Sequence, residues 1–191
     1  MANKDSAFGL RPIGKVGQNR DNQGLSEYDI AASASAIYQN DPVEMAATGT
    51  ITVAAATDTL LGSLTGVFFT DASTSKPTFA NHLEASNTAT DIKGFVSDDP
   101  YERFEIQSNN AGASNANDVF AVADIAYAAG SSPDYISGVE LNDSTIANGS
   151  SATLQILGAS KDPSNNDVGS ANVNWVVRIN EHELDMNVNG V

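Results

Sequence analysis

Turn-forming residues recur every few positions along this chain, and their spacing limits its fold more than any other feature of the sequence. Gly, Ser, Thr, Asn, Asp and Pro separate stretches that are short and that often alternate apolar with polar side chains. Such alternation is typical of β-strands with one buried face. The clearest case is residues 172–180, where one side of the predicted strand carries Val173, Trp175, Val177 and Ile179 and should face the core.

Further strand candidates and several long polar loops indicate an all-β fold. Residues 117–130 are rich in alanine, which suits a helix, but their apolar side chains also alternate, and a strand is the favoured interpretation. We therefore predict a compact β-barrel or β-sandwich with an extended N-terminal arm and long polar loops. The arm would cover residues 1–25 and the β-domain residues 26–191. The other candidate strands are residues 27–33, 49–55, 66–70, 104–107 and 152–159.

Composition excludes several kinds of site. The chain has no cysteine, so disulfides, thiolate metal sites and cysteine nucleophiles are absent. Its first residues lack the apolar core of a signal peptide, and no apolar run is long enough to cross a bilayer. We expect a soluble protein without a membrane partner that is not secreted by an ordinary signal route.

Charge is distributed unevenly along the chain. Nine basic and 24 acidic residues give a net charge of -15, which disfavours nucleic acid as a partner. Residues 1–20 nevertheless hold four basic residues and one acidic residue, so this segment is positive while the remainder holds five basic and 23 acidic residues. A basic leading segment on an acidic body predicts docking on an acidic surface, such as a second copy of the chain. The alternative is a solvated, disordered tail.

Four carboxylates lie within eight positions of one another and raise the question of a catalytic or cation site: Asp98, Asp99, Glu102 and Glu105. Pro100 biases the residue before it away from helix, and Asp side chains readily bond the backbone two residues on. The segment therefore predicts a turn between two strands, with Glu105 on the outer face of the second strand. We favour this structural turn over a cation site or a catalytic pair, because nothing nearby indicates the closed apolar pocket that would separate two carboxyl pKa values.

Other stretches predict no catalytic or metal-binding constellation. His82 and His182 each lack a second histidine at metal-ligand spacing, and we expect both at surface strand ends. Residues 62–66 do not match a nucleophile elbow, and no phosphate-binding or dinucleotide motif occurs. We therefore predict a protein that is not an enzyme, with no catalytic residue, no metal and no cofactor.

Several stretches, taken together, resemble a family of tailed-bacteriophage virion structural proteins that act as capsid cement or decoration proteins. The resemblance depends on an AFGLRP-type start, a DDP turn followed by FEIQ, and a closing VVRINEHEL strand. The matching stretches span most of the chain in order, and the match is weakest at residues 110–136. They are AFGLRPIGKV (7–16), NDPVEM (40–45), GVFF (66–69), GFVSDDPYERFEIQSN (94–109), SGVELN (137–142), LQILGASKDPSNNDVGSAN (154–172) and WVVRINEHEL (175–184).

The resemblance implies a β-domain that is seated on the outer face of the capsid, cements neighbouring major capsid protein subunits and stabilises the head. It implies assembly in the host cytoplasm and residence in the virion, with further copies as partners, as dimers or trimers at lattice symmetry axes. The N-terminal segment would reach a neighbouring subunit, since its first ~20 residues span roughly 65 Å when fully extended. Deletion of residues 2–20 should then leave a folded β-domain. The predicted contacts are Phe8, Leu10, Pro12, Ile13, Lys15, Arg20 and, as the preferred single contact, Arg11.

Two other function classes stay open. A receptor- or glycan-binding module of a phage head or tail fibre would need aromatic platforms for sugar stacking, and Tyr101, Tyr127 and Tyr135 are available. An enzyme such as a hydrolase is the third class, although no catalytic constellation supports it.

Overall fold

The structure, a computed structural model, describes residues 3–17, 24–109, 114–149 and 151–185. These residues form thirteen β-strands and two short 3₁₀ helices, η1 (Ala116–Asp118) and η2 (Asp143–Thr145), and no α-helix occurs among them. The predicted all-β fold is therefore confirmed.

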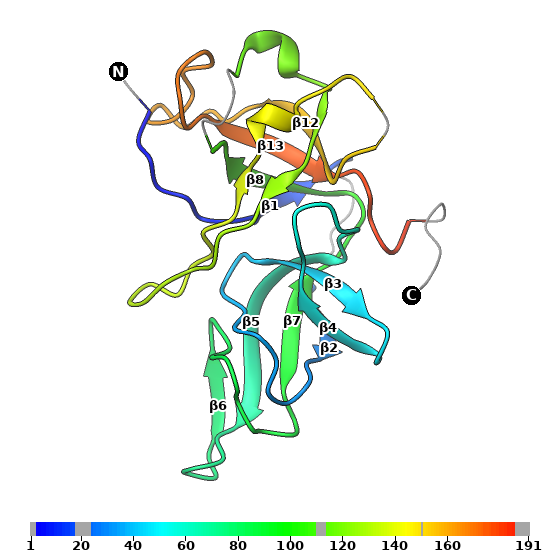
Figure 1. Ribbon diagram of the computed structural model, residues 1–191, viewed down its shortest axis with the longest axis vertical. Helices are drawn as coiled ribbons and strands as arrows, with labels where there is room; N and C mark the ends of the chain where they lie inside the picture. Colours follow the sequence, from blue (N-terminus) through cyan, green and yellow to red (C-terminus); the bar gives the residue numbers. More distant parts are fainter. Residues whose placement is uncertain (1–2, 18–23, 110–113, 150, 186–191) are drawn as a thin grey trace.

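The strands form two large antiparallel sheets and one small sheet, and the large sheets lie one above the other in Figure 1. The upper sheet has the order β1 (Arg11–Lys15), β8 (Glu102–Gln107), β13 (Asn174–Ile179), β12 (Leu154–Ala159), β9 (Val122–Ala123). The lower sheet has the order β2 (Ser26–Asp29), β7 (Lys93–Ser97), β5 (Gly62–Thr70), β3 (Pro42–Ala46), β4 (Thr50–Val53), and β6 (Pro77–Ala80) pairs with β5. The small sheet pairs β10 (Ile125–Ala126) with β11 (Glu140–Leu141).

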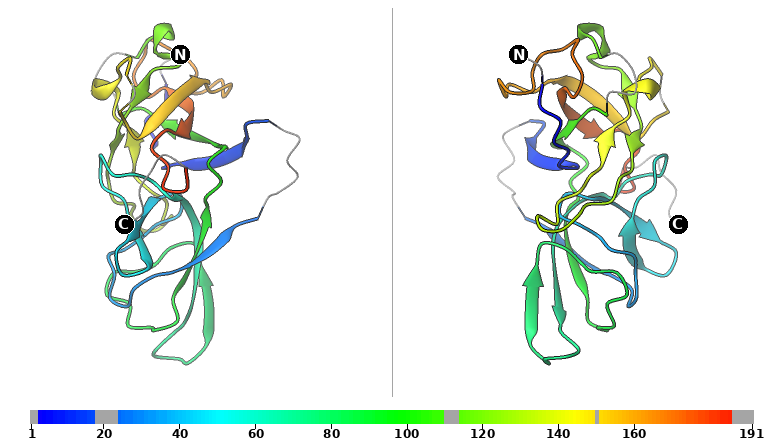
Figure 2. Two further views of the ribbon diagram at one scale, coloured as in Figure 1. Left: turned by 90° about the vertical axis from the view of Figure 1, so that its right-hand side faces the viewer. Right: turned by 60° about the vertical axis from the view of Figure 1, so that its left-hand side comes forward.

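Both ends of the sequence build the upper sheet. Strand β1 pairs with β8, which in turn pairs with β13, while β2 to β7 form the lower sheet between them in sequence. Figure 2 shows this division, with the blue N-terminal strand in the upper half and the cyan to green strands in the lower half. The predicted boundary after residue 25 falls between β1 of the upper sheet and β2 of the lower sheet, and the division into an arm and a β-domain stays a prediction. The arrangement is consistent with a β-sandwich, and no closed barrel is detected among the described strands.

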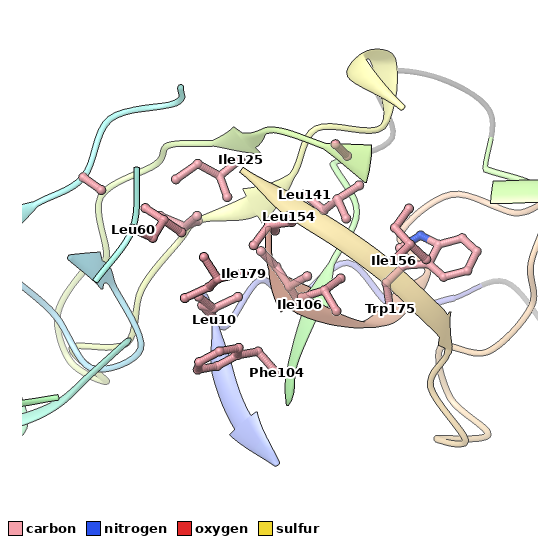
Figure 3. Close-up of a cluster of buried hydrophobic side chains, with 14 of the residues drawn as sticks. Leu10, Leu60, Phe104, Ile106, Ile125, Leu141, Leu154, Ile156, Trp175 and Ile179 are labelled. Atoms are coloured by element: carbon pink, nitrogen blue, oxygen red, sulfur yellow. The ribbon is translucent and has the colours of Figure 1, made fainter. Parts of the chain in front are cut away.

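The upper sheet packs on an apolar core that the alternation in residues 172–180 predicted. Trp175 and Val177 are fully buried and Ile179 is nearly so. Figure 3 shows Trp175 and Ile179 in one cluster with side chains from β8 and β12. Burying each large apolar side chain contributes roughly 1.5–3 kcal/mol, so the periodicity of this strand is a main determinant of the upper half of the fold.

The lower sheet has a separate core. Ile30, Ile51, Leu64 and Val96 are buried in it, and it does not share its members with the upper cluster. The chain passes between the two cores at the turn from β7 to β8, which is the DDP segment.

Residues 117–130 form short strands and not the continuous strand that their alternation favoured. The segment leaves η1 and contributes β9 and β10, and these two strands are interrupted at Asp124. The Asp124 carboxylate accepts hydrogen bonds from the backbone and hydroxyl of Thr153 at 3.2 and 3.3 Å. The contact lies where the chain passes from β9 of the upper sheet to β10 of the small sheet.

Candidate functional site

The N-terminal segment, residues 3–17, lies against its own chain as a strap across the molecule. Gln107 on β8 donates to the carbonyl of Lys4 at 3.0 Å and accepts from the backbone of Ser6 at 2.8 Å. Asn165 donates to the same Lys4 carbonyl at 2.7 Å. The segment is extended, as predicted, but the body of the same chain satisfies its backbone.

The strap also binds the lower half of the molecule. The backbone of Leu10 donates to Asn40 at 2.8 Å, Asn40 donates back to the carbonyl of Phe8 at 3.0 Å, and the hydroxyl of Ser63 donates to the carbonyl of Leu10 at 2.6 Å. The side chain of Leu10 is fully buried in the upper core (Figure 3). Leu10 was predicted to be an apolar anchor on a neighbouring subunit, whereas in this structure its side chain packs in the core of its own chain.

Arg11 forms an ion pair with Glu105 on β8, and its guanidinium lies 4.3 Å from the centre of the Phe8 ring. The Glu105 side chain is 9% exposed, whereas that of Arg11 is 47% exposed. The expectation that Glu105 lies on an outer, exposed face is therefore wrong, because Arg11, its partner on the neighbouring strand β1, lies against it. Pro12 pairs with Phe104 at the edge of the sheet, a position where its missing N–H is tolerated.

Lys15 closes the strap on the DDP turn. Its ammonium lies 2.7 Å from a carboxylate oxygen of Asp99 and 4.0 Å from one of Glu102. Burial raises the pKa of Glu102, and Lys15 opposes that shift. Ile13 keeps nearly half of its surface exposed and lines an open groove of about 430 Å³. The remaining predicted contact, Arg20, lies outside the described residues.

These contacts also correct the expected effect of a deletion. Removing residues 2–20 would take an edge strand from the upper sheet and Leu10 from its core. It would also remove two hydrogen bonds of the Gln107 amide, which would keep its bond to Asn174. An emptied leucine site alone costs about 2–5 kcal/mol, and each lost hydrogen bond adds about 0.5–1.5 kcal/mol. The truncated chain is therefore expected to be strongly destabilised.

The four clustered carboxylates have structural partners, and two of them, Asp99 and Glu102, share Lys15. Asp99 accepts from the backbone of Tyr101 two residues on, at 2.9 Å, so the predicted Asp-type turn between two strands is confirmed. Asp98 accepts from the hydroxyl of Tyr28 at 2.6 Å. Burial and this hydrogen bond raise the pKa of Tyr28 to about 12.

A second carboxylate cluster escaped sequence reasoning. Burial and the neighbouring Asp58 raise the pKa of Glu44 to about 7. Burial also raises the pKa of Glu183, whose carboxylate accepts from the backbone of Met45 at 2.8 and 3.0 Å. These acids come from β3, the loop before β5 and the turn after β13. Because they are distant in sequence, no local pattern predicts that they lie together.

The two histidines differ in their settings. His182 is 1% exposed and accepts the backbone N–H of Leu184 on Nδ1 at 3.0 Å, so the expected surface position is wrong. Burial lowers its pKa. His82 stacks on Tyr135 with ring centres 3.8 Å apart, and Tyr38 flanks the pair at 6.3 and 6.4 Å.

The tyrosines considered as sugar platforms occupy different surroundings. Tyr135 uses a ring face against His82. Tyr127 is 43% exposed, and burial together with Asp41 raises its pKa. Tyr101 follows the DDP turn and lines an open pocket together with Arg178 and Leu184.

Across the described parts of the chain, no group of three or more His, Asp or Glu side chains is arranged to hold a metal ion. Within the same parts, no helix combines the length and apolar character that crossing a membrane requires. No family model, no curated protein and no solved structure matches this chain.

Proposed function

We propose that this chain is a structural virion protein of a tailed bacteriophage that binds the outer surface of the capsid. There it would cement neighbouring major capsid protein subunits and stabilise the head. Its partners would be the major capsid protein and further copies of itself.

The observation that carries the proposal is how the family-like stretches assemble. The AFGLRPIGKV stretch contains β1, the FEIQ stretch lies in β8, and the WVVRINEHEL stretch contains most of β13. These three strands are adjacent in the upper sheet, although they come from distant parts of the sequence. The resemblance therefore covers one continuous structural unit and not a set of unrelated fragments.

The strap changes how such a protein would hold its neighbours. Its contacts join the upper and lower halves of one molecule, so it contributes rigidity within the subunit. A rigid body that contacts two capsid subunits at once gains avidity without a strong individual contact. Of the predicted strap residues, Ile13 retains an accessible apolar surface for such a contact.

Particle analysis tests the proposal directly. The purified chain should bind phage heads that lack it, and a cryo-electron microscopy map of intact particles should place it on the outer surface of the shell. Binding to host cells or host glycans in place of heads would support a receptor-binding module. Absence of the chain from mature particles would refute the proposed function.

A further inference from the structure

The outer face of the lower sheet carries three phenylalanines on adjacent strands. The strand register places Phe79 of β6 beside Phe68 of β5, and Phe95 of β7 beside Gly66 of β5. The ring centres of Phe79 lie 4.8 Å from Phe68 and 6.4 Å from Phe95. The Phe79 ring therefore lies within reach of an aromatic ring on β5 and of a second one on β7.

This aromatic cluster, Phe68, Phe79 and Phe95, faces away from the lower core. The opposite face of the same strands supplies Leu64, Val67 and other members of that core. Phe79 is 74% exposed, and its strand pairs only with β5 in the described sheet. Phe68 and Phe95 are half-buried beside it, so the exposed part of the cluster is centred on Phe79. An exposed apolar patch with a polar border is typical of interaction sites in soluble proteins.

Charged side chains border the cluster on β7, on β2 and just before β7. Lys93 pairs with Phe68 across β5 and β7, and its ammonium lies 2.7 Å from Asp29 and 3.4 Å from Glu27 on β2. Asp91 accepts from the backbone and hydroxyl of Thr70 at 3.0 and 2.7 Å, and these bonds lower its pKa. The carboxylates of Glu27, Asp29 and Asp91 thus outnumber the single ammonium of Lys93, and the border of the aromatic cluster is acidic.

We infer that this face is a docking surface for a protein partner that presents apolar side chains beside lysine or arginine. The net charge of -15 opposes pairing with a second acidic copy and favours a basic partner. The inference rests on the proposed function and specifies it, because it assigns the contact with the shell to the lower sheet.

Binding to phage heads that lack the chain tests the assignment. Phe79→Ser should weaken binding at least tenfold, because aromatic side chains at the centre of an interface carry much of its affinity. Phe120→Ser is the matched control, since Phe120 is 72% exposed but lies beyond η1 in the other half of the molecule, and its affinity should stay within twofold of the wild type. Circular dichroism checks that both variants fold.

A second variant tests the acidic border independently. The double substitution Glu27→Gln and Asp29→Asn should weaken binding at low salt and reduce its dependence on salt concentration. Equal binding by the wild type and every variant would remove this inference but leave the proposed function intact, whereas failure of the wild type to bind heads would remove both. Sedimentation that shows a wild-type dimer dispersed by Phe79→Ser would overturn the basic partner in favour of a second copy.

Discussion

Substitution of Gly9 by alanine tests whether the strap belongs to the fold of its own chain. Gly9 has φ of 72°, and a Cβ there would lie 2.4 Å from the carbonyl oxygen of Asn40 and 2.4 Å from the Cβ of Ser137. Neither neighbour is the end of a flexible side chain, so the backbone would have to move. Gly49 is the matched control, because its φ is 77° and a Cβ there would meet nothing within 4 Å.

The two substitutions share the backbone cost and differ in the steric cost. A left-handed conformation costs a residue with a Cβ about 1–2 kcal/mol, and overpacking costs a further ~1–3 kcal/mol. Gly49→Ala should therefore lower the free energy of unfolding by about 1–2 kcal/mol, and Gly9→Ala by about 2–5 kcal/mol. Urea titration measures both values, and a chain of this length loses about 2–4 °C in Tm per kcal/mol. Equal losses for the two variants would show that Gly9 is not packed between Asn40 and Ser137.

Three further predictions concern charged groups. Burial and a nearby carboxylate raise the pKa of Glu44 from 4.5 to about 7, so its contribution to stability is full below pH 4.5 and is lost as the pH rises through 7. Glu44→Gln should flatten the pH dependence of urea unfolding in that range, and an unchanged profile would contradict the assignment. Burial lowers the pKa of His182 below 6.5, so its contribution is full above that pH and is lost as the pH falls through the folded-state pKa. His182→Asn should reduce the loss of unfolding free energy between pH 7 and 5. An equally steep loss in the variant would contradict the assignment of this pH dependence to His182. Arg11→Ala should destabilise the chain by about 1–3 kcal/mol, because it leaves the buried Glu105 unpaired. In a double-mutant cycle, the added substitution Glu105→Gln should recover part of that loss. Additive losses of unfolding free energy for the two substitutions would show that Arg11 and Glu105 do not stabilise each other.

The proposed docking face on the lower sheet is a site that the sequence alone predicts only in part. The aromatic residues Phe68, Phe79 and Phe95 are visible in the sequence, but only the antiparallel register of β6, β5 and β7 brings their rings together. Local sequence patterns do not predict such a site, because its residues come from three separate strands.

The local sequence determined that residues 172–180 form a half-buried strand and that the DDP segment forms a turn. The period of two in residues 172–180 fixed which side chains of β13 face the core, and Asp99 with Pro100 fixed the turn before β8. Only the tertiary structure decided what covers the second face of β8. Alternation separates the two faces of a strand, but it does not say whether water or another segment lies on the polar one. Glu105 and Gln107 are buried because the N-terminal strap lies beside them and bonds their side chains. Contacts between segments so distant in sequence are set by the packing of the whole molecule.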